Sequence, residues 1–419
     1  MSESPWWRIS VRNLGRNMRR TVITALGLAF GYFAVVALIG IDDGLVDEMV
    51  TNGTGIINGQ VQVHAPDYLP DRSVYATIGG DTGINVTALL DSITADPAVT
   101  AATPRVFGGG LVSTGSSTMG GTLFGFDPTR EPEVARLTAS LTAGRLPGPD
   151  AHAVVIGSEM ARRIHAAVGD TVVVVAPAAD GSLGNDLYVV SGIFTTGIAD
   201  VDAAFALMPI HTLQRLMALA PSRVHEIAIR VPDPWEATAV AARLRQRLAA
   251  AGMQVAVRPW TESNPELVQY ADLIRAANWV ILFVVFGMAI FGVANTMLMA
   301  TYERRREFAL LLVLGAAPRR IVRTVLYEAL VLGLVSLVAG AAITVPILIW
   351  WHHSPPDLSK IFGSFTLAGA LVRPVLKTNF PPLMAAVSGV ALLATALAAA
   401  VIPAFRAARV PPADTLSGR

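Results

Sequence analysis

Long runs of apolar residues divide this chain of 419 residues into segments. Residues 21–41, 276–302 and 381–405 contain no charged side chain, and residues 324–351 contain only Glu328. Each run meets or exceeds the ~20 apolar residues that a helix needs to cross a hydrocarbon core of ~30 Å. The pattern therefore predicts four transmembrane helices, one at each run.

Arginines gather beside these runs in three segments, residues 1–20, 303–323 and 406–419. If the chain crosses the membrane four times, all three segments lie on the same side. The positive-inside rule identifies that side as the cytoplasm. We therefore expect both chain ends in the cytoplasm, and residues 42–275 and 352–380 on the opposite side. The arginines concerned are Arg8, Arg12, Arg16, Arg19, Arg20, Arg304, Arg305, Arg306, Arg319, Arg320, Arg323, Arg406, Arg409 and Arg419.

The segment 42–275 alternates between strand-like and helix-like patterns. Residues 59–64 show the period of two that is typical of a strand, and Asp180-Gly181 between apolar runs predicts a β-hairpin. A glycine-rich turn is expected at residues 108–110. We expect a mixed α/β extracytoplasmic domain of two subdomains, inserted between the first and second transmembrane helices. Expected strands are residues 59–64, 99–107, 110–113, 171–177, 187–194, 225–231 and 253–259; expected helices are residues 86–96, 158–167, 209–218 and 234–251.

The arginine-rich segments have patterns of their own. Residues 303–323 combine a charged start, an apolar stretch, Gly315 and Pro318. Because glycine often ends a helix and proline often begins one, a short helix before Gly315 and a second near Pro318 are predicted. Such a segment is too short for a domain but has the right size to dock on a partner. Residues 1–20 are expected to form an interfacial amphipathic helix, although a basic flank of the first span explains them equally well. Residues 406–419 form a cytoplasmic tail.

The composition narrows the classes of function. Hydrophobic residues make up 53% of the chain and its mean hydropathy is +0.52, which is high for a soluble protein. The chain has no cysteine, which excludes disulfides, thiol catalysis and cysteine metal sites. Since the topology already accounts for the arginine clusters, no basic surface is left to indicate nucleic-acid binding.

Sequence motifs for catalysis are also absent. The chain has no glycine-rich phosphate-binding loop with its lysine, no HExxH and no GxSxG pattern. His352, His353 and Asp357 come nearest to a metal cluster, but adjacent histidines rarely converge on one ion. We therefore expect no catalytic residue, no metal and no cofactor in this chain.

A few small or polar residues interrupt the apolar runs. Gly27 and Gly31 form a GxxxG pattern, which allows two helices to approach closely, either within the chain or in a dimer. Asn295 is expected to hydrogen-bond to a neighbouring helix. Because Glu328 lies near the cytoplasmic end of its span, we expect it to pair with Arg323 or another cytoplasmic arginine rather than to relay protons.

Short motifs follow one another in a fixed order along the second half of the chain. They are Asn295-Thr296-Met297, residues 303–308 (ERRREF), Leu314-Gly315-Ala316, Glu328-Ala329 with Gly333, and residues 402–410 followed by Pro412, Ala413 and Leu416. In this order, and with four spans, they resemble the signature of FtsX-like ABC transporter permeases. That superfamily includes macrolide-exporter-type and lipoprotein-releasing permeases. The resemblance covers essentially the whole chain.

Within the superfamily, the external segment resembles the lipoprotein-releasing permeases of the LolC and LolE type. The stretches that carry this resemblance are residues 59–68, residues 125–128 with Glu131, and residues 141–145. It implies a homo- or heterodimer of permeases in the bacterial inner membrane, each bound to a separate ATPase that holds ATP and Mg. It further implies mechanotransmission, in which ATPase closure moves the external domains and an acylated lipoprotein passes to a periplasmic carrier.

The resemblance also implies roles for particular residues. The segment 303–323 would couple the chain to the ATPase, and a cleft beside the first and second spans would receive cargo. Coupling candidates are Glu303, Arg304, Arg305, Arg306, Glu307, Leu314, Gly315 and Ala316. Cleft candidates are Phe30, Phe33, Leu38, Phe286 and Ile290, for which ordinary packing or lipid contact is an equally good explanation. Efflux of a peptide, lipid or toxin, signalling to external hydrolases, and a membrane-anchored scaffold without an ATPase stay open as alternatives.

Overall fold

The computed structural model describes residues 18–357, 365–367, 370–372 and 375–417, and the chain divides into two compact units. The helical unit is built from Met1–Val46, Ala271–Ile361 and Pro374–Arg419. The sheet unit is built from Asp47–Tyr270 and Phe362–Arg373. Most of the predicted amphipathic helix at residues 1–20 lies outside the described residues.

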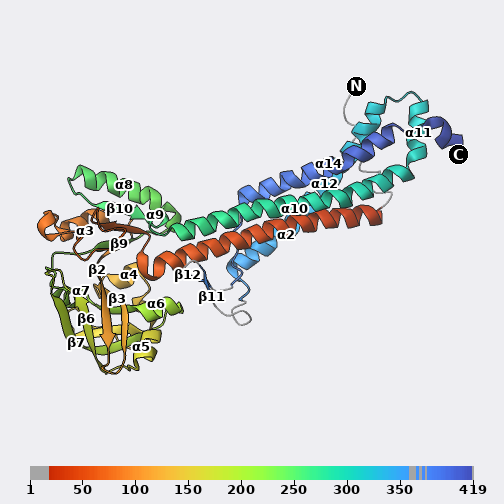
Figure 1. Cartoon of the computed structure of the whole chain (residues 1–419). Helices are drawn as coiled ribbons and strands as arrows, with labels where there is room; N and C mark the ends of the chain where they lie inside the picture. Colours follow the sequence, from red (N-terminus) through yellow and green to blue (C-terminus); the bar gives the residue numbers. More distant parts are fainter. Residues whose placement is uncertain (1–17, 358–364, 368–369, 373–374, 418–419) are drawn as a thin grey trace. The chain divides into compact units, whose positions relative to one another are not determined.

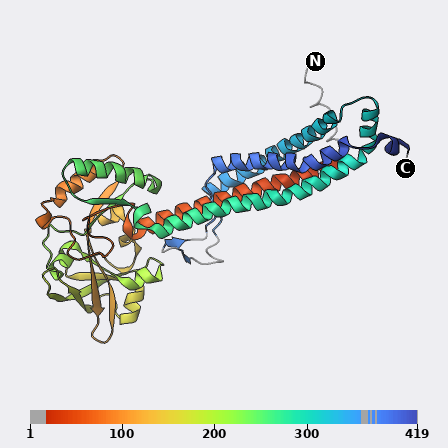
Figure 2. The same cartoon turned by 45° about the horizontal axis from the view of Figure 1, so that its top comes forward.

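Four long helices make up most of the helical unit, and they run alongside one another in both views (Figures 1 and 2). They are α2 (Met18–Gly53), α10 (Pro265–Glu303), α12 (Pro318–His353) and α14 (Pro382–Ala408). All four are long and apolar enough to cross a membrane, which confirms the four predicted apolar helices. α2 continues past the predicted end of the first span and leads into a π-helical turn at Thr54–Asn58.

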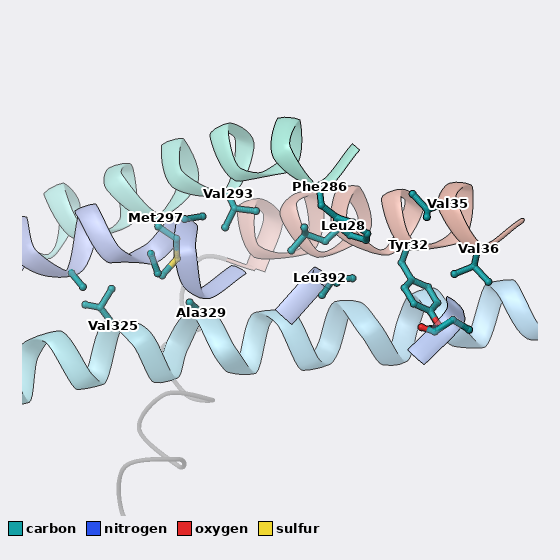
Figure 3. Close-up of a cluster of buried hydrophobic side chains, with 14 of the residues drawn as sticks. Leu28, Tyr32, Val35, Val36, Phe286, Val293, Met297, Val325, Ala329 and Leu392 are labelled. Atoms are coloured by element: carbon teal, nitrogen blue, oxygen red, sulfur yellow. Dashed lines mark hydrogen bonds between the residues drawn. The ribbon is translucent and has the colours of Figure 1, made fainter. Parts of the chain in front are cut away.

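A shared apolar core lies between the four helices (Figure 3). Leu28 and Tyr32 of α2, Phe286 of α10 and Leu392 of α14 are all buried in it. The Tyr32 hydroxyl also donates a hydrogen bond of 3.3 Å to the carbonyl oxygen of Ala385 in α14. Because lipid is as apolar as these side chains, close packing and interhelical hydrogen bonds stabilise a bundle in a membrane more than hydrophobic burial does.

The close approach of α2 and α12 depends on Gly340 and not on the predicted GxxxG pair. A Cβ atom at Gly340 would lie 3.0 Å from the carbonyl oxygen of Ala29, so a larger residue would push the two helices apart. Among the described residues, none lies within 4 Å of a Cβ built at Gly27, and the nearest to Gly31 is Val285 at 3.8 Å. Packing within the chain is therefore not found at Gly27, which is exposed.

Ten strands of the described residues form one mixed sheet in the sheet unit. Its order is β10-β1-β9-β2-β3-β8-β5-β7-β4, and β6 pairs with both β2 and β7. The β3–β8 and β5–β7 pairs are parallel and the other pairs are antiparallel. The strands are β1 (Val61–His64), β2 (Ala101–Ser113), β3 (Thr118–Phe126), β4 (Leu141–Gly144), β5 (Ala153–Gly157), β6 (Thr171–Pro177), β7 (Leu183–Phe194), β8 (Phe205–Pro209), β9 (Glu226–Arg230) and β10 (Ala256–Pro259).

Short helices connect these strands and complete the expected mixed α/β fold (Figure 1). They are α3 (Val86–Thr94), α4 (Glu131–Val134), α5 (Ser158–Ile164), α6 (Ala199–Ala204), α7 (Ile210–Leu216), α8 (Ala237–Ala250) and α9 (Trp260–Ser263). A separate two-stranded pairing joins β11 (Phe365–Leu367) to β12 (Ala370–Val372). The predicted hairpin is confirmed, because β6 and β7 pair across a turn that contains Gly181 at φ 84°.

The predicted turn at residues 108–110 is wrong, because β2 continues through it as one strand. These glycines serve close packing across the sheet. A Cβ at Gly108 would lie 2.7 Å from the Met217 side chain, and one at Gly110 would lie 2.7 Å from the carbonyl oxygen of Val175. Glycine inside a strand can mark such close approach as well as a turn.

A buried charge cluster lies in the core of the sheet unit, centred on Arg105 of β2. Its guanidinium binds Glu131 through two hydrogen bonds of 2.6 and 3.1 Å and Glu226 through one of 3.2 Å. Arg105 and Glu131 are fully buried and Glu226 is nearly so. The guanidinium also lies 5.2 Å from the centre of the Phe124 ring. Burying these charges requires that they stay paired.

Candidate coupling site

The predicted helix in the segment 303–323 is present as α11 (Arg305–Val313), and Gly315 ends it as predicted. Gly315 has φ 86°, a left-handed conformation that favours glycine. Its N–H donates to the carbonyl of Leu312, and the N–H of Ala316 donates to that of Leu311. These two bonds are the Schellman cap that satisfies the last carbonyls of a helix. The tight cap lets α12 begin only a few residues later, with Pro318 as its first residue.

Arg304, immediately before α11, binds residues of both α11 and α12. Its Nε donates to Glu307 at 3.1 Å, and its Nη1 donates to both carboxylate oxygens of Glu328 in α12, at 2.8 and 3.0 Å. The guanidinium also lies 5.2 Å from the centre of the Phe308 ring. The expected pairing of Glu328 with an arginine of the segment 303–323 is therefore confirmed.

The two neighbouring carboxylates affect the pKa of Arg304. Partial burial alone would lower its pKa, but the nearby charge of Glu328 and the bonds to Glu328 and Glu307 outweigh that effect. The pKa of Arg304 is thus raised above its usual value. Arg304 stays charged and ties α11 to α12.

A second ion pair joins α2 to the end of α10, at the same end of the bundle. Arg20 of α2 donates to both carboxylate oxygens of Glu303, at 2.9 and 3.1 Å. Four residues along α2, the Thr24 hydroxyl donates to the Thr296 hydroxyl of α10 at 3.2 Å. Glu303 is therefore a tie between α2 and α10, which the sequence did not reveal because the partners are 283 positions apart.

One side of α11 is buried and the other is exposed. Phe308 and Ala309 are buried, and Phe308 belongs to the core of the helical unit. On the other side, exposed apolar side chains follow Arg306 at spacings of three and four residues. They form the α11 stripe, which we define as Arg306, Leu310, Val313 and Leu314.

The α11 stripe has the character of a docking surface. Leu314 is 82% exposed and Val313 is 62% exposed, outside the apolar runs that are predicted to contact lipid. Arg305 and Arg306 are also exposed. A helix that presents leucine and valine beside exposed arginine side chains has the features of a protein-binding face, since exposed apolar patches mark interaction sites.

The remaining polar candidate lies elsewhere. Asn295 is exposed on α10, and among the described residues it makes no hydrogen bond to another helix. The interhelical bond expected of it is made by its neighbour Thr296. The one-position difference places the two side chains about 100° apart around the helix, so only Thr296 faces α2.

The cleft candidates differ in accessibility. Phe30 is 66% exposed and packs its ring against Phe33, at a centroid distance of 6.1 Å. Leu38 is exposed as well. Phe286 is buried in the core, and Phe33 and Ile290 pack against that core. Of these five residues, Phe30 is therefore largely exposed and Leu38 is about one-third exposed, and the role of all five in cargo binding stays a prediction.

The described residues contain no group of three or more histidine, aspartate or glutamate side chains that could hold a metal ion. His352 instead uses Nδ1 to contact the carbonyl oxygen of Thr378 at 2.8 Å. The interactions of this site are thus ion pairs, caps and apolar contacts, which suit binding and movement.

Two family models match successive parts of the chain. The model for the MacB-like periplasmic core domain matches residues 21–247, more than half of the chain. The model for the FtsX-like permease C-terminal region matches residues 279–412. This second match contains α11, its cap and the Arg304 cluster.

Relatives of known assignment match over most of their length. The lipoprotein-releasing system transmembrane protein LolC of Neisseria meningitidis is 24% identical over 413 residues, covering 94% of this chain and 93% of the relative. LolC of Xylella fastidiosa is 24% identical and covers 77% of this chain and 78% of the relative. LolE of Haemophilus influenzae is 22% identical, with coverages of 63% and 64%.

Solved structures similar to part of the chain include the periplasmic region of MacB from Actinobacillus actinomycetemcomitans. It has 15% identity and a TM-score of 0.35, and covers 54% of this chain and 94% of that structure. From the family matches and the relatives together, the chain belongs to the superfamily of FtsX-like, MacB-type ABC transporter permeases, with relatives among the lipoprotein-releasing LolC and LolE permeases.

Proposed function

We propose that this chain is the permease subunit of a bacterial ABC transporter that releases lipoproteins from the inner membrane. It pairs with a second permease, identical or different, and each permease binds a separate ATPase that holds ATP and Mg. Both chain ends lie in the cytoplasm and the sheet unit lies in the periplasm. ATP hydrolysis by the partner is coupled to periplasmic work by mechanotransmission, and the released lipoprotein passes to a periplasmic carrier.

The observation that carries this proposal is the geometry of α11. Its exposed stripe offers a partner an apolar surface, while Arg304 fixes its start to Glu328 in α12. A soluble partner that moves the stripe therefore moves a long apolar helix. A scaffold that only anchors an external domain has no need for such a linkage.

Two ties would carry the movement into the bundle. Arg304 connects α11 to α12, and Arg20 connects α2 to Glu303 at the end of α10. Because α2 and α10 are the helices that lead into the sheet unit along the chain, a shift at their cytoplasmic ends is transmitted along them. Helices with intact backbone hydrogen bonds are stiff enough for this role.

The cargo assignment rests on two further observations. The LolC relative from Neisseria meningitidis is named for lipoprotein release and matches this chain over 94% of its length. Phe30 and Leu38 also present exposed apolar side chains on α2, where acyl chains of a membrane-bound cargo are accessible.

The test is purification of the tagged chain from native membranes in mild detergent, with mass spectrometry of the proteins that accompany it. We expect a stoichiometric ABC ATPase together with acylated lipoproteins. A double variant, Leu310→Asp with Leu314→Asp, should lose the ATPase, because a buried carboxylate without a partner is costly at an apolar interface. Met18→Asp is a matched control, since Met18 is 63% exposed and lies outside the α11 stripe.

The outcomes separate the alternatives. An ATPase without lipoproteins would retain the permease and point to efflux of another cargo. Purification of the chain with no ATPase would contradict the proposal and favour the anchored scaffold. Arginine reversal is a poorer test at Arg304, because a glutamate there would face Glu307 and Glu328 and disturb the fold itself.

A further inference from the structure

A hollow of about 480 Å³ lies at the end of the helical unit where α10 ends and α14 ends. On one side it is lined by Tyr302 of α10 and Arg305, the first residue of α11, and on the other by Ile402, Phe405, Arg406 and Arg409 at the end of α14. Under the proposed topology this end faces the cytoplasm. The hollow is separate from the exposed stripe of α11, which does not line it.

The hollow brings together three guanidinium groups that lack a carboxylate partner. Among the described residues, Arg305, Arg406 and Arg409 form no ion pair, and no aspartate or glutamate lines the hollow. Other arginines at the same end are neutralised, because Arg20 and Arg304 each bind glutamates. Within the described part of the chain, the positive charge of the hollow is therefore not compensated.

The wall of the hollow that α14 forms changes from apolar to basic towards the end of the helix. The side chains that line it from this helix share one face, because their positions are i, i+3, i+4 and i+7: Ile402, Phe405, Arg406 and Arg409. Ile402 and Phe405 lie in the predicted span and are exposed, whereas the two arginines follow the span. An apolar wall and a basic rim thus meet where the hydrocarbon core gives way to headgroups.

We propose that this hollow binds an anionic phospholipid of the cytoplasmic leaflet. Guanidinium groups bind phosphate oxygens through paired, charge-assisted hydrogen bonds. The exposed Ile402 and Phe405 side chains contact the acyl chains, and the Tyr302 ring lies at the depth that aromatic residues prefer. Basic pockets between transmembrane helices on this side of a membrane are suited to such headgroups.

An acidic segment of the ATPase is a poorer occupant. It would satisfy the arginines, but it would leave Ile402 and Phe405 uncovered, because a water-soluble partner does not enter the hydrocarbon layer. A phospholipid matches both parts of the hollow, because its phosphate binds the arginines while its acyl chains cover Ile402 and Phe405. The proposal relies on the assigned topology but not on the identity of the cargo.

The test is lipid titration of the purified full chain in non-ionic detergent, followed by native mass spectrometry. Palmitoyl-oleoyl phosphatidylglycerol should bind and the matching phosphatidylcholine should bind far less. The double variant Arg406→Gln with Arg409→Gln should weaken phosphatidylglycerol binding about tenfold or more, as expected for loss of two interfacial arginines. Arg305 is left unchanged because it is also a coupling candidate.

A matched control removes the same charge from the same end of the bundle. Arg319→Gln with Arg320→Gln alters two exposed arginines of α12 that do not line the hollow, and should change binding less than about twofold. Phe405→Ala should weaken phosphatidylglycerol binding without any change in charge. It also serves as a second probe if the arginine variant is poorly produced.

Four results would overturn the proposal. Equal binding of the two lipids would remove the headgroup preference, and equal losses in both double variants would reduce it to general surface charge. Displacement of the lipid by free glycerol phosphate would show that the apolar wall contributes nothing. The ATPase should still co-purify with the Arg406→Gln, Arg409→Gln variant. If that variant loses the ATPase but still binds lipid, the two arginines bind protein instead of lipid. If the proposed function is wrong, the ATPase will be missing from every variant and from the parent chain.

Discussion

Two arginine clusters in this chain have the same composition but different surroundings. Arg105 in the sheet unit and Arg304 beside α11 each bind two glutamates, and each lies 5.2 Å from the centre of a phenylalanine ring. The side chain of Arg105 is fully buried, whereas that of Arg304 is 20% exposed. The same set of groups is thus shielded from solvent around Arg105 and partly exposed to solvent around Arg304.

This difference in exposure determines the cost of separating the arginine from its glutamates. Around Arg105, water cannot replace a lost partner, so the cluster opens only with the fold of the sheet unit. Around Arg304, solvent can solvate a separated charge, so loss of one partner costs less and does not unfold the helical unit. The first cluster specifies a rigid domain, and the second suits a joint that transmits movement.

The largest predicted effect is at Arg105. Arg105→Met would leave the Glu131 and Glu226 carboxylates buried without their counter-charge, which costs about 3–5 kcal/mol. We expect hydrogen exchange of peptides from β2 and β9 to accelerate about a hundredfold or more, since each 1.4 kcal/mol corresponds to tenfold. Arg105→Lys keeps the charge and should have a smaller effect. Unchanged exchange in the methionine variant would show that the cluster is not essential to the fold.

A smaller and local effect is predicted at Arg304. Arg304→Gln removes the charge-assisted bonds to Glu328 and Glu307, with an expected cost of about 1–2 kcal/mol for a partly exposed group. Hydrogen exchange should rise about tenfold in α11 and stay unchanged in the sheet unit. Arg306→Gln is the control, because Arg306 is exposed and lies on the stripe. Faster exchange throughout the bundle would contradict the local joint.

The third prediction concerns His225, next to Glu226 in the buried cluster. Its Nδ1 accepts a hydrogen bond of 3.0 Å from the N–H of Phe107, and its Nε2 donates one of 3.0 Å to the carbonyl of Val74. The bond from Phe107 requires the neutral ring, because a protonated Nδ1 cannot accept it, whereas the charged ring could still donate to Val74. Burial, with a smaller contribution from the charge of Arg223, therefore lowers the pKa of His225 below its usual value.

The sign of the pH effect follows from that shift. Because the unfolded state binds a proton near pH 6.5 and the folded state does not, stability is present above that pH and is lost as the pH falls below it. The slope from this residue reaches at most about 1.4 kcal/mol per pH unit. Urea unfolding of the sheet unit at pH 7.5 and 5.5 should show a smaller pH dependence in His225→Gln than in the parent. An equal pH dependence of the unfolding free energy in both proteins would contradict the assignment of this effect to His225. Glu226, whose pKa is raised by burial, is present in both proteins and so does not account for a difference between them.

The sequence was most informative where one residue type has one physical role. Long apolar runs with no charge or a single charge predicted the four long helices, because the hydrocarbon core tolerates few other residues. Gly315 predicted the end of α11 because a left-handed cap favours glycine. The expected arginine partner of Glu328 followed from its depth, although the sequence did not single out Arg304.

The sequence was least informative where distant segments meet. Arg105 finds its partners 26 and 121 positions away, a distance that no local pattern reveals. β5 and β8 were missed because both strands are buried on almost every residue and so lack alternation. The glycines of β2 were interpreted as a turn because a strand with close neighbours and a turn use the same residue.

The measurement that tests the central claim most directly uses the absence of cysteine from this chain. Leu314→Cys provides a single thiol on the α11 stripe for a short photo-crosslinker, and Met18→Cys provides one outside it. After illumination of native membranes, we predict a crosslinked product of Leu314→Cys that contains an ABC ATPase and is absent from Met18→Cys. A Leu314→Cys protein that labels efficiently but yields only lipid or no adduct would contradict docking at α11.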